Sequence, residues 1–303
     1  MKIYIIAGEV SGDQIAACLL KALKATGQPL ELKGIGGSLM AAEGLNSSID
    51  MKEFAVNGLV EVIRHIPRLQ KRMAQIVDEV LAYQPDLLLT VDSPGLALRI
   101  HKKVDQAFKD KDKPFKQVHI VAPTVWAWKP WRAKKMAAYL DHLLVNLPFE
   151  PPYFTVHGLN TDYVGHPVTE LVPMAQADRF VAGKSPGKRY VVLAPGSRRS
   201  EVTKLLPTFM DAAKRLIDQD PSLEIIVPTV ETVETLVRDM LTEADLPHHL
   251  VLGQEARWQA FAAADLAIAA SGTIALELGM LSVPTIVSYK TNPITAAIAR
   301  RLV

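Results

Sequence analysis

The sequence predicts an α/β protein made of two doubly wound, Rossmann-like domains that face each other across a cleft. Short apolar runs alternate along the chain with segments that place apolar residues at helical spacing. The runs are apolar throughout, which is typical of strands buried on both faces of a parallel sheet. This alternation stops and restarts within 303 residues, a length that favours two cores over one. Domains are therefore expected at residues 1–167 and 168–303.

The first half begins with a predicted strand and helix. Residues 2–7 (KIYIIA) form an apolar run, and Ile15 and Leu19 then mark a helix that is expected to stop at Gly27. A later helix is predicted to begin at Pro67, because proline suits the first helical turn and the apolar residues after it share one face. Further strands are predicted at residues 30–37, 85–92 and 116–123.

The second half repeats the form of the first. Residues 146–189 are rich in proline and glycine and are interpreted as a linker region. After them, residues 189–202 (RYVVLAPGSRRSEV) resemble residues 2–13 (KIYIIAGEVSGD) in having a strand, a glycine turn and a helix start. In such sheets, ligands bind at the carboxyl ends of the strands. The remaining strands are predicted at residues 222–229, 248–254, 265–270 and 283–290.

The composition is that of a globular protein, with 49% hydrophobic and 22% charged residues. A formal charge of +2 excludes a protein that is basic over its whole surface, so no nucleic acid is expected as a partner. The single cysteine, Cys18, excludes an internal disulfide, and the histidines lack metal-ligand spacing, so no metal or cofactor is assigned. The N-terminus does not resemble a signal peptide, and no apolar run approaches the ~18 residues that span a bilayer. A cytoplasmic protein is expected.

Two strand-to-helix turns in the second half predict an anion site, with a nucleotide diphosphate as its ligand. In the first turn, Gly196 lets the backbone approach, Ser197 can cap the helix and Arg198 can bind a phosphate. Residues 270–277 (ASGTIALE) have the same form, and their glutamate is placed to accept bonds from sugar hydroxyls. Two ordinary capped helix starts are the alternative. The other residues assigned to this site are Glu201, Ser271, Gly272, Thr273 and Glu277.

The first half contributes a carboxylate. Asp92 ends an apolar run directly before Ser93, where it can be a general base or a helix cap. Residues 8–13 (GEVSGD) can contact substrate hydroxyls or cap the first helix; the residues assigned are Glu9, Ser11, Gly12 and Asp13. Residues 125–135 (VWAWKPWRAKK) mix tryptophans with basic residues, which suits nucleic-acid stacking or a pocket for a phosphorylated, partly apolar ligand. From this segment we assign Trp126, Trp128 and Arg132.

Together these motifs resemble the lipid-A-disaccharide synthase family, bacterial inverting glycosyltransferases of the GT-B fold. The motifs AGEVSGD, VDSP, PTVWAW with Arg132 after it, LPFE, GHPV, PGSRRSEV and ASGTIALE occur in the family's order. The resemblance implies transfer of 2,3-diacylglucosamine from its UDP derivative to 2,3-diacylglucosamine 1-phosphate (lipid X), forming a β(1→6) disaccharide and UDP. It places Arg198 and Glu277 with UDP and makes Asp92 the base for the acceptor 6-hydroxyl. A UDP-N-acetylglucosamine 2-epimerase or a non-catalytic nucleic-acid-binding protein are the alternatives.

The sequence departs from the family pattern at two places. The family has Pro-Asp-Phe-Asn after the aspartate, whereas Gly95, Leu96 and Ala97 follow Pro94 here, so acceptor contacts are expected to differ. The family also continues for several dozen residues beyond the position of Val303, so residues 168–303 are expected to lack its C-terminal tail.

An acylated substrate also favours contact with a membrane. Residues 58–72 combine apolar and cationic side chains, as a helix lying on an anionic membrane surface does. A core-facing helix with a solvated basic side is the alternative. The protein is expected to be peripheral on the inner membrane, and a homodimer is left open. The apolar residues of the expected patch are Leu59, Val60, Val62, Ile63, Ile66 and Leu69.

Overall fold

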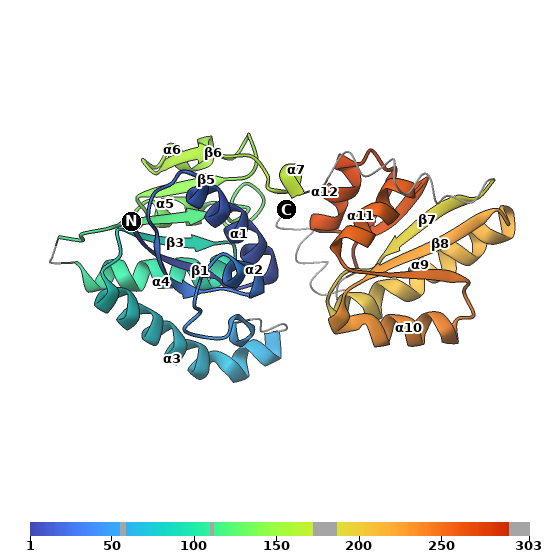
Figure 1. Ribbon diagram of the computed structural model, residues 1–303, viewed down its shortest axis with the longest axis horizontal. Helices are drawn as coiled ribbons and strands as arrows, with labels where there is room; N and C mark the ends of the chain where they lie inside the picture. Colours follow the sequence, from blue (N-terminus) through green and yellow to red (C-terminus); the bar gives the residue numbers. More distant parts are fainter. Residues whose placement is uncertain (55–58, 110–111, 172–186, 291–303) are drawn as a thin grey trace. The chain divides into compact units, whose positions relative to one another are not determined.

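The chain folds into two compact α/β units, Met1–Pro167 and Val168–Leu302. The computed structural model describes residues 1–54, 59–109, 112–171 and 187–290. Each unit has one parallel sheet with helices packed against it (Figure 1). The predicted fold class, two parallel Rossmann-like sheets, is confirmed.

The sheet of the first unit has six parallel strands in the order β2-β1-β3-β4-β5-β6. Strand β2 lies on one side of β1, whereas β3 lies on its other side and β4 to β6 follow outward from β3. The strand order therefore reverses between β1 and β3. Ala7 at the end of β1 pairs with Val91 at the end of β3. Loops that follow these two strands therefore lie at the switch point where such sheets bind ligands. The strands are β1 (Lys2–Ala7), β2 (Glu31–Ile35), β3 (Leu87–Val91), β4 (Lys116–Ile120), β5 (His142–Val145) and β6 (Asn160–Tyr163).

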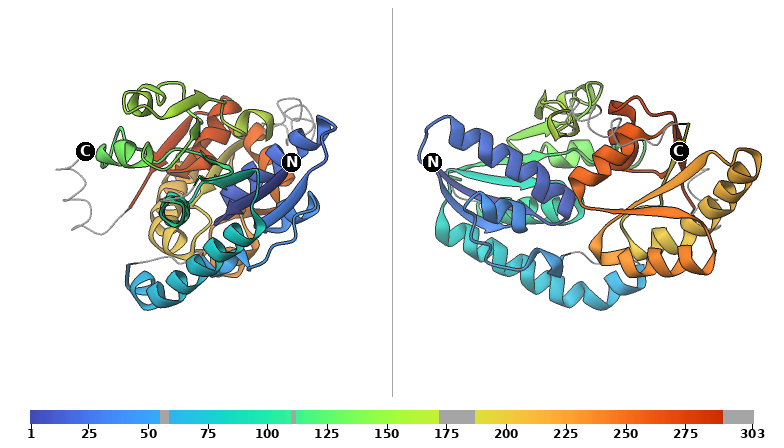
Figure 2. Two further views of the ribbon diagram at one scale, coloured as in Figure 1. Left: turned by 90° about the vertical axis from the view of Figure 1, so that its left-hand side faces the viewer. Right: turned by 45° about the vertical axis from the view of Figure 1, so that its right-hand side comes forward.

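Alternate residues of β1 enter two different cores, because successive side chains of a strand point to opposite faces. Tyr4 and Ile6 pack with residues of α3 and α4, whereas Ile3 and Ile5 pack with residues of α1 and α2. The long helix α3 thus lies across the sheet from α1 (Figures 1 and 2). The helices are α1 (Val10–Ala25), α2 (Ser38–Ala42), α3 (Leu59–Tyr83), α4 (Pro94–Ala107), α5 (Trp131–Met136) and α6 (Pro152–Thr155), with a 3-10 turn at Met51–Glu53.

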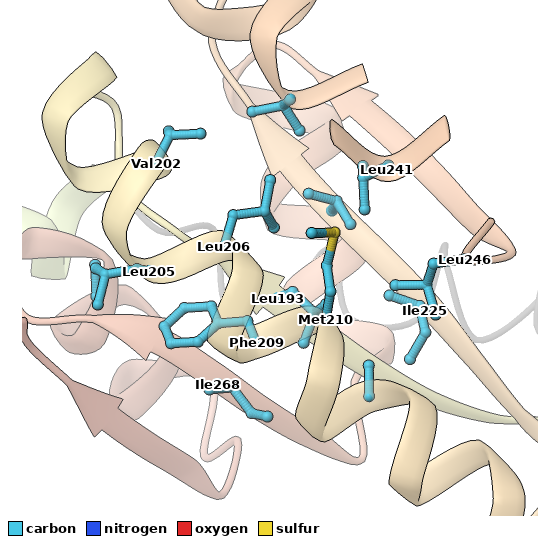
Figure 3. Packing of buried hydrophobic residues seen from close by; sticks show 14 of the residues in the cluster. Leu193, Val202, Leu205, Leu206, Phe209, Met210, Ile225, Leu241, Leu246 and Ile268 are labelled. Atoms are coloured by element: carbon cyan, nitrogen blue, oxygen red, sulfur yellow. The ribbon is translucent and has the colours of Figure 1, made fainter. Parts of the chain in front are cut away.

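The sheet of the second unit has five parallel strands in the order β11-β10-β7-β8-β9. Its switch point lies between β7 and β10. Helix α9 buries Leu206, Phe209 and Met210 against the strands (Figure 3). The strands are β7 (Arg189–Ala194), β8 (Leu223–Thr229), β9 (His248–Leu252), β10 (Leu266–Ala270) and β11 (Thr285–Ser288). The helices are α7 (Val168–Leu171), α9 (Arg199–Gln219), α10 (Glu234–Glu243), α11 (Gln254–Ala263) and α12 (Thr273–Met280), with a 3-10 turn at Glu231–Val233.

Two expectations about the first unit are wrong. Helix α3 begins at Leu59 and contains Pro67, because the apolar spacing continues before the proline and only one backbone hydrogen bond is lost there. The segment 146–189 is not simply a linker, since it includes α6 and the edge strand β6. The sequence of β6, Asn-Thr-Asp-Tyr, is polar and largely exposed, so it lacks the apolar signal of a strand.

Candidate active site

Asp92 lies at the switch point of the first sheet, directly after β3. Its N–H donates to the carbonyl of Ile120 (2.9 Å), and its backbone then turns sharply into α4. Asp92 and Ser93 both have left-handed backbone conformations, with φ values of 56° and 44°. Such conformations are costly for residues other than glycine and concentrate at functional sites. The N-cap residue of α4 is Ser93 and not Asp92, so the carboxylate does not occupy the capping position.

Two donors hold the Asp92 carboxylate. The Ser93 N–H donates to Oδ1 (2.8 Å), and the Ser11 hydroxyl donates to Oδ2 (2.5 Å). Ser11 reaches this position because α1 begins very close to β3. A Cβ atom on Gly12 would lie 2.8 Å from the Val91 carbonyl oxygen, so a side chain there would push the helix away. The GEVSGD and VDSP motifs therefore form one cluster.

Asp13 has a structural role. Its buried carboxylate accepts bonds from the N–H groups of Gly37 (2.8 Å), Leu39 and Met40 (both 3.1 Å), which form the start of α2. The Asp13 carboxylate therefore caps α2 and not the first helix, and its expected contact with substrate stays a prediction. Glu9 is the N-cap residue of α1.

A buried chain of hydrogen bonds lies beneath Asp92, and its direction follows from the Gln117 amide. The Gln117 Nε2 donates to the Tyr139 carbonyl (2.7 Å), so its Oε1 accepts from His101 Nδ1 (3.0 Å). His101 Nε2 then accepts from the Thr90 hydroxyl (2.7 Å), whose oxygen accepts from His119 Nδ1 (2.7 Å). His101 is neutral in this arrangement, because its Nδ1 donates and its Nε2 accepts, whereas for His119 the bonds show only that Nδ1 carries a proton.

The pKa values of the two histidines agree with neutral rings. Burial lowers the pKa of His101 to about 3. Burial also lowers the pKa of His119 to about 4, although the negative charge of Asp92 acts in the opposite direction. The sequence indicated no role for these histidines, because the residues of this hydrogen-bond chain come from β3, α4 and β4 and are not adjacent in sequence.

The tryptophans form an exposed aromatic surface in the first unit. Trp126 and Trp128 are 43% and 39% exposed. Trp126 packs edge-to-face against Phe149 of the LPFE motif (5.4 Å between centroids), and Lys129 lies over the Trp128 ring (5.2 Å). Arg132 lies in the first turn of α5 and is half-buried. This surface can bind a ligand that is partly apolar and partly anionic.

In the second unit, the two predicted turns follow the adjacent strands β7 and β10, where Ala194 pairs with Ala269. Gly196 has φ +103°, a conformation that favours glycine, and a Cβ atom there would collide with the Glu201 carboxylate. Arg198 is half exposed, and its guanidinium lies 3.4 Å from Glu201. The expectation that Ser197 caps α9 is wrong. The N-cap residue is Arg198, and its side chain makes no capping hydrogen bond.

The second turn leads into α12, and Gly272 is its N-cap residue. Ser271, Gly272 and Thr273 are exposed, whereas Glu277 is buried. Both oxygens of Glu277 are held from α11: Arg257 Nη2 donates to Oε1 (3.0 Å) and Trp258 Nε1 donates to Oε2 (3.2 Å). Sequence analysis missed both partners, because nothing in α11 indicates that it faces α12.

Each unit thus has a cluster of polar residues at the switch point of its parallel sheet, and a chain of two such α/β units has the GT-B fold. The UDP-GlcNAc 2-epimerase of Neisseria meningitidis, solved with UDP-GlcNAc bound, has a similar fold. Its TM-score is 0.66 at 12% identity, over 99% of this chain and 85% of that one.

Sequence comparison identifies the family. The family model described as lipid-A-disaccharide synthetase matches residues 3–303, and the chain belongs to this family. It is 41% identical to the lipid-A-disaccharide synthase of Rhodospirillum centenum over 99% of this chain and 75% of the relative. Identity to the lipid-A-disaccharide synthase of Paramagnetospirillum magneticum is 43%, over 99% of this chain and 77% of the relative. The resemblance inferred from the motifs is confirmed.

Proposed function

We propose that the chain transfers 2,3-diacylglucosamine from its UDP derivative to the 6-hydroxyl of lipid X, forming the β(1→6) lipid A disaccharide and UDP. Asp92 accepts the proton of the acceptor hydroxyl. The hydroxyl oxygen bonds to the anomeric carbon of the donor, and the bond from that carbon to the UDP oxygen breaks with its electron pair. One such displacement inverts the anomeric configuration.

The principal support is the position of Asp92. Its carboxylate is fixed by Ser11 and Ser93 at the carboxyl end of β3, so its orientation does not have to be established when substrate binds. Gly95 lies one residue after the start of α4, and a Cβ atom built there meets nothing within 4 Å. This open space, with Trp126, Trp128 and Arg132 in the same unit, is the proposed acceptor side.

The UDP side of the proposal rests on the second unit. Arg198 can donate to the diphosphate, and the amino ends of α9 and α12 add positive charge near the same strand ends. These groups stabilise the charge that develops on UDP as it leaves, so the mechanism requires no metal ion. Glu277 is proposed to accept bonds from the sugar hydroxyls. Glu201, Ser271, Gly272 and Thr273 complete the proposed nucleotide site.

Peripheral binding to the cytoplasmic face of the inner membrane is also proposed, through the amino-terminal part of α3. Among the helices that the structure describes, none has both the length and the apolar character needed to span a bilayer. Ile66 is 40% exposed and Leu69 is half-buried, whereas the side chains of 59–65 lie outside the described residues. Two of the expected headgroup-binding cations, Arg68 and Arg72, contact Glu53. A homodimer remains a prediction.

Two incubations test the proposed function. With UDP-2,3-diacylglucosamine and lipid X, the chain should produce a disaccharide and UDP. With UDP-N-acetylglucosamine alone, it should leave the sugar unchanged. Formation of UDP-N-acetylmannosamine would instead identify a 2-epimerase, whose fold is the same. Salt-sensitive binding to RNA or DNA without affinity for UDP would favour the nucleic-acid-binding alternative.

A further inference from the structure

Glu277 is an unusual group to find below the surface, because its carboxyl can carry a charge. It is 6% exposed, and burial raises the pKa of its carboxyl above the ordinary value. The positive charge of Arg257 and the N–H of Trp258 act in the opposite direction. Helix α12 packs against α11, β10, β11 and α7. Among the described residues of these elements, Arg257 is the ionisable residue that contacts the Glu277 carboxylate.

The bonds from α11 also fix the orientation of the carboxylate. Arg257 and Trp258 are consecutive residues of one helix, and each donates to a different oxygen of Glu277. A carboxylate has about four lone-pair positions. One position on each oxygen is therefore occupied by a fixed donor, and the others remain for hydroxyl groups of a ligand.

Stability alone does not explain this arrangement. The Arg257 side chain is largely buried, and its Nε–H has no hydrogen-bond partner among the described residues. A buried donor without a partner lowers stability, and a buried ion pair contributes less than its geometry suggests. An apolar contact between α11 and α12 would avoid both costs, so the pair requires another explanation.

We propose that Arg257 and Trp258 are positioning residues of the nucleotide site, which hold Glu277 charged and oriented so that it accepts hydrogen bonds from the sugar hydroxyls of UDP. This inference rests on the proposed function, because it assumes that UDP binds at the ends of β7 and β10. Arg257 acts through Glu277, and its loss would leave a carboxyl group that protonates more readily. A protonated Glu277 would offer fewer acceptors to the ligand.

The test is the affinity for UDP, measured by calorimetry between pH 8 and pH 6. Arg257→Gln keeps a polar side chain and removes the charge. Its Kd should exceed that of the wild type, and the ratio of the two Kd values should rise as pH falls, by up to about tenfold per pH unit. Using the ratio cancels the titration of UDP itself. Arg257→Lys restores the charge and should restore the pH profile even where affinity is lower.

Two further variants separate this role from a structural one. Arg238→Gln removes an exposed arginine that contacts Glu234 on α10, so it loses the same charge without changing UDP affinity. Trp258→Phe keeps an aromatic ring, removes the indole N–H and should weaken UDP binding several-fold. Thermal melting without UDP reports folding for each variant. If folded Arg257→Gln or Trp258→Phe binds UDP like the wild type at every pH, the inference is wrong. A wild type that binds no UDP overturns it together with the proposed function.

Discussion

Replacing Asp92 by asparagine removes the proposed base with little change in shape. Asparagine tolerates left-handed backbone conformations better than most residues, so φ +56° can be kept. The Ser93 N–H can still donate to the side-chain oxygen. The amide nitrogen then faces Ser11, whose hydroxyl can rotate to accept a hydrogen bond. The turn between β3 and α4 should therefore stay intact.

The expected loss of activity exceeds the expected loss of stability. Exchanging the charge-assisted bond from Ser11 for a neutral one should cost about 1 kcal/mol of folding free energy. Removing a general base lowers the rate by about 10²–10⁴, which corresponds to about 2.7–5.5 kcal/mol in the barrier. Turnover should thus fall by at least a hundredfold in a protein that remains folded.

The assay is the rate of disaccharide formation, with KM for both substrates and the melting temperature measured for each variant. Asp86→Asn is the matched control, because Asp86 lies at the other end of β3 and accepts the Lys2 N–H (2.7 Å) away from the switch point. Its turnover should remain normal. Near-normal turnover of Asp92→Asn would show that the carboxylate is structural, and a large rise in KM with unchanged kcat would assign it to binding.

Three further predictions concern the nucleotide, the buried histidines and the membrane. Arg198→Ala should weaken UDP binding by about 1.5–3 kcal/mol, the range for a charged hydrogen bond, and Arg199→Ala by much less; equal calorimetric effects would contradict the assignment. His101 and His119 stay neutral in the fold while the unfolded chain protonates near pH 6.5, so the free energy of unfolding should fall below that pH. The slope should reach about 1.4 kcal/mol per pH unit for each histidine, and urea denaturation giving the same stability at pH 7 and pH 5 would refute this. Serine replacements in α3 should release the folded protein from anionic vesicles in a flotation assay, whereas an unfolded variant would show that the segment is core. The residues replaced are Val60, Val62, Ile63 and Ile66.

The fold was predictable from the sequence where burial determines the pattern. Strands such as β3 and β7 are mostly apolar because helices cover both faces of the sheet. The edge strand β6 has no such cover, so its polar sequence resembles a loop. The prediction that α3 begins at Pro67 was wrong for a different reason. A proline is permitted inside a helix when the apolar face continues on both sides of it.

Candidate residues were predictable where a motif contains them, and their partners were not. Asp92 and Ser11 each stand in a recognisable motif, but the bond between them depends on the approach of α1 to β3. Asp13 belongs to the same motif and turns instead to the backbone of α2. Arg257 and Trp258 lie about twenty residues before Glu277, and only the packing of α11 against α12 brings them together.

The stereochemistry of the product tests the central claim most directly. The chain is incubated with UDP-2,3-diacylglucosamine and lipid X, UDP is quantified, and the new glycosidic bond is assigned by NMR. A single displacement assisted by Asp92 predicts equal amounts of UDP and a disaccharide, with the anomeric configuration inverted to β(1→6). Retention of configuration cannot arise from a single back-side displacement and would contradict the mechanism. UDP release without any disaccharide would show hydrolysis of the donor and contradict the proposed transfer.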